Sequence, residues 1–140
     1  MRNLGLDIGE RRIGIAISDA EEILASPLIT LARENDEKAV DEIAKLAIQH
    51  EIKRIVVGMP YSLNGTMGIQ ANKVMTFIDK LRMCTDIEIK VQDERLSTVA
   101  AERLMVEAGM KSDRRKLQRD AAAATLILQA YLDSQGLFEE

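Results

Sequence analysis

Residues 3–19 read NLGLDIGERRIGIAISD and contain the first two strands of the predicted fold. Residues 3–8 form an apolar run interrupted by one acid, Asp7, while residues 12–18 alternate three isoleucines with smaller residues. Short runs of this kind are typical of strands. Because only Gly9-Glu10-Arg11 separates the two runs, we expect them to pair as an antiparallel hairpin.

Beyond this hairpin the spacing of apolar residues predicts one more strand and then helices alternating with strands. The third strand, residues 28–32, follows a predicted turn around Ser26-Pro27, and Asn35 or Asp36 is the expected N-cap of the first helix. The other predicted strands are residues 54–59 and 87–91, and the predicted helices are residues 36–49, 69–83, 97–108 and 113–134. This order predicts an α/β fold with a mixed five-stranded sheet, first an antiparallel meander and then parallel strands, flanked by helices.

Length and composition limit what the chain can be. Its 140 residues fit a single domain covering residues 1–140. Aromatic residues make up 3% of the chain and the net charge is −4, which excludes a nucleic-acid binder that stacks bases or attracts phosphates through a global positive field. One cysteine and one histidine exclude an intrachain disulfide and a metal site built on those residues. No apolar stretch reaches about 18 residues, so we expect no membrane span and a cytoplasmic protein.

Carboxylates are therefore the candidates for chemistry. Asp7 interrupts the first strand, where a charge is costly unless it is paired or coordinates a cation. Asp93 and Glu94 follow the strand of residues 87–91, and Asp120 stands at the start of an apolar helix face beside four alanines. If the first and last strands are neighbours, these acids converge and can hold Mg²⁺ or Mn²⁺. Two such ions beside a phosphate would support hydrolysis of a phosphodiester bond.

Each acid also has a purely structural interpretation, which its spacing leaves open. Asp7 can be a turn residue that accepts a hydrogen bond from the Gly9 backbone. Asp93 can cap the helix that follows it, and Asp120 can pair with a neighbouring basic residue. Adjacent residues on a strand face opposite sides of a sheet, so the spacing does not decide between Asp93 and Glu94.

Motifs along the chain resemble the YqgF (RuvX) family of ribonuclease-H-like nucleases. In chain order they are Leu6-Asp7-Ile8-Gly9, residues 12–19, Val57-Gly58-Met59-Pro60, Asn64-Gly65-Thr66, residues 93–98 and Asp120 before Ala122-Ala123. They cover essentially the whole chain, and the Asp-Glu-Arg block is the most specific of them. The resemblance implies a ribonuclease-H-like fold and a bacterial, cytoplasmic nuclease that processes the 5′ end of pre-16S rRNA or resolves Holliday junctions.

The resemblance also implies roles for particular residues. The catalytic acids that bind the metal ions, two Mg²⁺ or Mn²⁺, would be Asp7, Glu94 and Asp120, and the supporting residues would be Asp93, Arg95 and Asp19. Arg95 would hold a phosphate or a site carboxylate. The residues expected to contact the nucleic-acid backbone are Arg11, Arg12, Lys111, Arg114, Arg115 and Lys116. The alternative for this basic group is an ordinary solvated face.

The sequence allows three alternatives to a nuclease acting on RNA. The opening Gly-Leu-Asp-Ile-Gly also resembles a phosphate loop of actin-like kinases and Hsp70-type ATPases, but those proteins need two such domains and this length supplies one. A domain of this fold can also bind RNA or a protein without cutting. A resolvase of four-way DNA junctions needs a dimer with two sites, and the sequence leaves both the substrate and the choice of monomer or dimer open.

Overall fold

A computed structural model of the chain describes residues 1–61, 67–93 and 112–138, with side chains over 1–61, 67–93 and 122–135. Its elements are β1 (Arg2–Ile8), β2 (Arg12–Ser18), β3 (Ala25–Ala32), α1 (Asp36–Gln49), β4 (Ile52–Met59), α2 (Ile69–Cys84), β5 (Glu88–Asp93) and α4 (Ser112–Phe138). The predicted helix over residues 97–108 lies outside the described residues. Within the described ranges, no helix has the length and apolar character needed to cross a membrane.

The strands in these ranges form one mixed sheet in the order β3-β2-β1-β4-β5, which confirms the predicted architecture. The central strand, β1, pairs antiparallel with β2 and parallel with β4. β2 pairs antiparallel with β3, and β4 pairs parallel with β5. The carboxyl ends of the three parallel strands β1, β4 and β5 therefore lie together at one end of the sheet, which we call the carboxyl edge.

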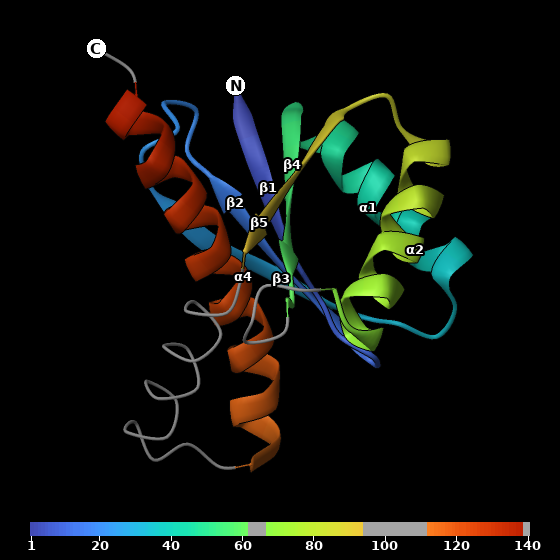
Figure 1. Cartoon of the computed structure of the whole chain (residues 1–140). Coiled ribbons are helices and arrows are strands. Elements are labelled where there is room, and N and C mark those ends of the chain that lie inside the picture. The colour runs from blue at the N-terminus through green and yellow to red at the C-terminus, as the bar shows by residue number, and fades with distance from the viewer. Residues whose placement is uncertain (62–66, 94–111, 139–140) are drawn as a thin grey trace.

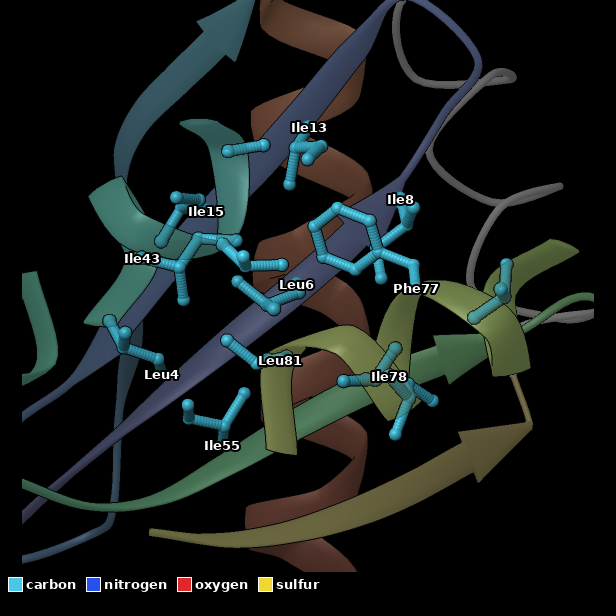
Figure 2. Close-up of a cluster of buried hydrophobic side chains, with 14 of the residues drawn as sticks. Leu4, Leu6, Ile8, Ile13, Ile15, Ile43, Ile55, Phe77, Ile78 and Leu81 are labelled. Atoms are coloured by element: carbon cyan, nitrogen blue, oxygen red, sulfur yellow. The ribbon is translucent and has the colours of Figure 1, made fainter. Parts of the chain in front are cut away.

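Helices cover both faces of the sheet, with α1 and α2 on one face and α4 on the other (Figure 1). The side chains of a strand alternate between the two faces. Leu4, Leu6 and Ile8 of β1 belong to the core beneath α1 and α2, together with Phe77 and Ile78 (Figure 2). The second core lies under α4, and its buried members are Ala16, Ala25, Val56, Ala124, Ile127, Leu128, Tyr131 and Leu132. The odd-numbered residues of β1 therefore face α4.

The helices follow the predicted boundaries closely. α1 spans Asp36–Gln49, as predicted, and Asn35 is confirmed as its N-cap, because its side chain accepts a hydrogen bond of 2.8 Å from the Lys38 backbone N–H. α2 ends one residue later than predicted, at Cys84, and α4 continues to Phe138. Apolar periodicity and the cap residue were therefore sufficient to locate α1.

The start of β3 differs from the prediction. The strand begins at Ala25, so Ser26 and Pro27 lie inside it and not in a turn. β3 is an edge strand, where a proline that donates no hydrogen bond is tolerated. Pro27 pairs with Ala16 at an irregularity of the β2–β3 register. At the start of the strand, the Ala25 backbone N–H donates a hydrogen bond of 2.9 Å to the Gln129 side chain of α4.

Candidate functional site

Asp7 lies near the end of the central strand, at the carboxyl edge. Its neighbours Leu6 and Ile8 are buried beneath α1 and α2, so the alternation of the strand turns Asp7 toward the face that α4 covers. The residue is partly buried and pairs with Gly14 of β2. A carboxylate is thus held on the central strand, at the edge where ligands bind in open α/β sheets.

Gly5 allows α4 to approach β1 closely. A Cβ atom at Gly5 would lie 2.7 Å from the Leu128 Cβ and 3.0 Å from the Ala124 carbonyl oxygen. The helix therefore lies directly on the backbone of the strand. Ala123 and Ala124 are buried at this contact face. The alanine-rich block thus brings α4 close to the sheet.

The direction of α4 brings position 120 to the same edge as Asp7. Tyr131 lies beside Arg54 near the start of β4, whereas Ala124 lies over β1 two residues before Asp7. α4 therefore runs antiparallel to β1 (Figure 1). Four helical residues, a rise of about 6 Å, separate position 120 from Ala124, which is close to the advance of about 6.6 Å made by two strand residues. The backbone of position 120 therefore reaches the level of Asp7, while the side chain of Asp120 lies outside the described residues.

The first and last strands are not neighbours, because β4 lies between them. The condition under which the sequence places the acids side by side is therefore not met. Strands two apart are separated by about 9.6 Å. Gly58 of β4 pairs with Gln92 of β5, and it lies one residue beyond the pair formed by Leu6 and Val57. Because Gly58 has no side chain, β4 contributes none between Asp7 and the end of β5 on the α4 face.

Asp93 points to the other face of the sheet. It pairs with Met59, whose side chain is buried in the core beneath α1 and α2. Paired residues of neighbouring strands share a face, so Asp93 lies opposite the face that carries Asp7. The structure does not bring these two carboxylates together. Glu94 and Arg95 lie outside the described residues.

Asp19 lies at the opposite edge of the sheet from Asp7, because it follows β2 beside the start of β1. Its Oδ1 accepts hydrogen bonds from the backbone N–H groups of Ile23 at 2.7 Å and Leu24 at 3.2 Å. These bonds lower the pKa of Asp19, the Ile23 bond most strongly. Asp19 thus closes the β2–β3 loop, and the structure does not bring it to the other candidate acids.

The basic candidates divide into two groups. Arg11, which is exposed, and Arg12, which is partly buried, lie in and directly after the β1–β2 turn, beside Asp7. Arg114, Arg115 and Lys116 belong to the first turns of α4, whose amino-terminal end extends past the carboxyl edge of the sheet (Figure 1). Their side chains, and the whole of Lys111, lie outside the described residues.

Arg33, at the end of β3, was not predicted from the sequence. Its Nη1 donates to the Gly9 carbonyl oxygen at 2.7 Å, and its Nε donates to Asp36 Oδ1 at 2.8 Å. The hydrogen bond from Arg33 is the main reason that the pKa of Asp36 is lowered, with a further contribution from Lys80. No sequence pattern marks Arg33. Asp36 lies three residues away, but Gly9 is brought to Arg33 only by the fold.

The donor chemistry at the carboxyl edge fits a hard divalent cation. Asp7 supplies carboxylate oxygens, the ligands that Mg²⁺ and Mn²⁺ prefer. Among the residues whose side chains are described, no group of three His, Cys, Asp or Glu residues is placed to hold a metal ion. The two further acids implied by the resemblance, Glu94 and Asp120, have side chains outside that set.

The strand order, the helices on both faces and the carboxylate on the central strand define a ribonuclease-H-like domain, and two solved structures share the fold. Thermus thermophilus RuvC in complex with a Holliday junction substrate matches with a TM-score of 0.61 and 16% identity, over 97% of this chain and 96% of that chain. The fowlpox virus resolvase in complex with Holliday junction DNA matches with a TM-score of 0.59 and 12% identity, over 99% of this chain and 100% of that chain.

The chain belongs to the RuvX family, whose model, described as Holliday junction resolvase, matches residues 1–134. A Clostridium botulinum relative named "Putative pre-16S rRNA nuclease" is 48% identical over 96% of this chain and 98% of its own length. A Desulforamulus reducens relative of the same name is 44% identical over the same shares. The chain is therefore a member of a nuclease family, as its motifs predicted.

Proposed function

We propose that this chain is a metal-dependent endonuclease that hydrolyses a phosphodiester bond at the 5′ end of precursor 16S rRNA. The observation that carries the proposal is the carboxyl edge itself. There Asp7 is held on the central strand facing α4, and α4 brings the backbone of position 120 to the same level. A carboxylate in this place is costly unless a cation or another partner offsets it.

In this proposal Asp7, Glu94 and Asp120 hold Mg²⁺ or Mn²⁺, with two ions as the expected number. The register of the sheet supports Glu94 over Asp93 as the ligand that accompanies Asp7. Asp93 takes the face of Met59, opposite the face that carries Asp7. Asp19 is left out of the ligand set because it is bound within its own loop at the other edge.

Metal ions at these carboxylates would supply an activated water and charge stabilisation at the leaving oxygen. The residues of the chain would do the rest. Asp7 directs its carboxylate toward the space beneath α4. On that face β4 places no side chain between Asp7 and the end of β5, because the residue of β4 at this level is Gly58. Arg95 holds a phosphate or one of the site carboxylates, and guanidinium groups suit both because they bind in a bidentate manner.

The substrate is proposed from the relatives and from the charge of the chain. The two relatives at 44 and 48% identity carry the name of a pre-16S rRNA nuclease, and this substrate implies a cytoplasmic location. With 3% aromatic residues, recognition would use phosphate contacts at the carboxyl edge and not base stacking. Those contacts are assigned to Arg11, Arg12, Lys111, Arg114, Arg115 and Lys116.

A second candidate function is the resolution of four-way DNA junctions. It is favoured by the description of the family model and by the substrate named for Thermus thermophilus RuvC. A resolvase must make two symmetric cuts, so this function also requires a dimer with two sites. An equilibrium measurement of the molecular mass bears directly on that requirement.

One experiment separates these functions. The purified chain is incubated with Mg²⁺ or Mn²⁺ on a precursor 16S rRNA carrying its 5′ leader, and in parallel on a four-way DNA junction. Asp7→Asn, which keeps the size of the side chain and removes its charge, is compared with the wild type. The matched control is Asp41→Asn, because Asp41 is an exposed residue of α1 whose described partner is the surface residue Lys45.

We expect the wild type and Asp41→Asn to cleave the RNA, and Asp7→Asn to lose at least about a hundredfold in rate. Cleavage of the junction alone would replace the RNA substrate with DNA. Equal activity of Asp7→Asn and wild type would overturn the assignment of the site. Binding without cleavage of either substrate would identify a non-catalytic module.

A further inference from the structure

The turn of residues 9–11 follows the central strand directly and is fixed by contacts from outside. The Gly9 N–H donates to the Arg12 carbonyl oxygen at 2.9 Å, and a Cβ atom at Gly9 would lie 2.8 Å from that oxygen. A larger residue therefore does not fit without moving the turn. At the next position, the Lys73 ammonium of α2 lies 3.5 Å from Glu10 Oε1. The turn is thus a defined structure and not a loose connection.

Arg33 binds this turn at both of its ends. The Arg33 backbone N–H donates to the Arg11 carbonyl oxygen at 2.8 Å, and its Nη1 donates to the Gly9 carbonyl oxygen at 2.7 Å. The two carbonyl groups belong to the first and last residues of the turn. A charge-assisted hydrogen bond to a carbonyl is stronger than a neutral one, so the guanidinium adds substantially to the backbone contact.

The Arg33 side chain is itself held in place, with 15% of its surface exposed. Its Nε donates to Asp36 Oδ1 at 2.8 Å, and its guanidinium carbon lies 5.0 Å from the centre of the Phe77 ring. Asp36 also accepts a hydrogen bond of 3.0 Å from Lys80. The guanidinium is therefore committed to the protein, whereas Arg11, whose carbonyl oxygen is held by the Arg33 backbone N–H, has an exposed side chain.

We propose that Arg33 is a positioning residue for nucleic-acid binding. It fixes the turn of residues 9–11 in the conformation in which the exposed Arg11 side chain meets a phosphate of the substrate. The inference rests on the proposed function for the role of Arg11 and deepens it, because it assigns the placement of that contact to a residue that does not touch the substrate.

A double-mutant cycle tests this division of roles. The dissociation constant of a fluorescent RNA containing the precursor 16S 5′ leader is measured in EDTA, as a function of salt, so that no cleavage occurs. The variants are Arg11→Gln, Arg33→Lys and the double variant. Lysine keeps the charge of Arg33 but cannot reproduce the fork of hydrogen bonds to Gly9 and Asp36. Arg82→Lys is the matched control, because Arg82 is exposed on α2 away from the turn.

We expect Arg11→Gln and Arg33→Lys each to weaken binding by roughly tenfold and to reduce the salt slope by about one unit. The double variant should bind no more weakly than Arg11→Gln alone, since Arg33 acts through Arg11. Arg82→Lys should bind like the wild type. If Arg33→Lys lowers the folded fraction, Asp36→Asn is the second variant, because it loosens Arg33 without changing either arginine, and its effect should likewise vanish in the Arg11→Gln background.

Additive losses in the double variant would overturn the inference, because they would show that Arg33 acts independently of Arg11. Unchanged binding of Arg33→Lys would overturn it as well. A wild-type chain that binds the RNA but does not cut it would contradict the proposed nuclease activity. The role of Arg33 in binding would then still be decided by the double-mutant cycle. A wild-type chain that does not bind the RNA would overturn both.

Discussion

At the scale of single residues, the candidate site depends on two glycines, and a side chain is excluded at each of them for a different physical reason. At Gly9 a Cβ atom would meet the Arg12 carbonyl oxygen at the start of β2, whereas at Gly5 it would meet the helix α4. The first glycine shapes the connection after Asp7. The second sets the distance between α4 and β1, and with it the separation of Asp7 from position 120.

Gly5→Ala should therefore destabilise the protein and reduce nuclease activity. A methyl group 2.7 Å from the Leu128 Cβ forces α4 away from the sheet, and overpacking of this kind costs about 1–3 kcal/mol. Urea unfolding measures that loss, and cleavage assays under conditions where the variant is folded measure the effect on the site. Gly68→Ala is the control, because nothing lies within 4 Å of a Cβ at Gly68. A stable Gly5→Ala variant with full activity would contradict the role of the contact.

At the scale of elements, Gln129 connects α4 to the segment that leads into β3. Its Oε1 accepts from the Ala25 N–H at 2.9 Å, and its Nε2 donates to the Ile23 carbonyl oxygen at 2.9 Å. One amide side chain thus satisfies a donor and an acceptor of the backbone where the edge strand begins. The contact also fixes the rotation of α4 about its own axis.

Gln129→Ala should lower the free energy of unfolding by about 1–3 kcal/mol, because it leaves the backbone groups of Ala25 and Ile23 without this partner. Hydrogen exchange of the Ala25 amide should accelerate more than exchange in β1. Gln135→Ala is the matched control, because Gln135 is exposed on the same helix. Equal stability of the two variants would show that the contact contributes nothing.

The elements themselves were largely predictable from the sequence. Residues 36–49 bury apolar side chains at helical spacing behind an Asn cap, and the three residues between the two apolar runs at the start of the chain allow only a tight hairpin. The start of β3 was missed because Pro27 indicates a turn unless the strand is known to lie at an edge. Strand order decides that, and strand order is a property of the whole sheet.

The candidate site was predicted less completely, for the same reason. Asp7 could be singled out because a charge in an apolar strand is unusual. The face on which Asp93 lies depends on its pairing with Met59, and the position of Asp19 depends on β2 returning to the start of β1. Arg33 could not be found at all, since its contacts with Gly9 and Phe77 join parts of the chain that are far apart in the sequence.

At the scale of the whole molecule, the two edges of the sheet carry different kinds of charge arrangement. The edge opposite Asp7 contains an ionic network that joins β1, β4, β5 and the β2–β3 loop. Its members are Asn3, Glu22, Lys53, Arg54 and Glu88. The guanidinium carbon of Arg54 lies 5.6 Å from the centre of the Tyr131 ring of α4, so the network also contacts the helix. We infer that this edge supports the fold, while the carboxyl edge carries the chemistry.

The network should make the protein sensitive to acid. The pKa of Glu22 is lowered from its ordinary value of 4.5, first by the hydrogen bond from Asn3 and then by Lys53. Hydrogen bonds likewise lower the pKa of Glu88, Asp36 and Asp19. The folded state binds these protons less tightly than the unfolded chain does. Stability should therefore be fully present above the ordinary carboxyl values and fall as the pH decreases through them toward the lower folded values.

Glu22→Gln tests the source of this acid sensitivity, measured by urea unfolding between about pH 7 and pH 3. The variant should lose about 1 kcal/mol at neutral pH, because an amide holds Asn3 and Lys53 less strongly than a carboxylate does. It should also lose less stability than the wild type as the pH falls, since one of the carboxyls that takes up a proton is gone. Glu21→Gln, its exposed neighbour, should follow the wild-type curve. If Glu22→Gln falls as steeply with acid as the wild type, the sensitivity arises elsewhere in the molecule and the ionic edge does not govern it.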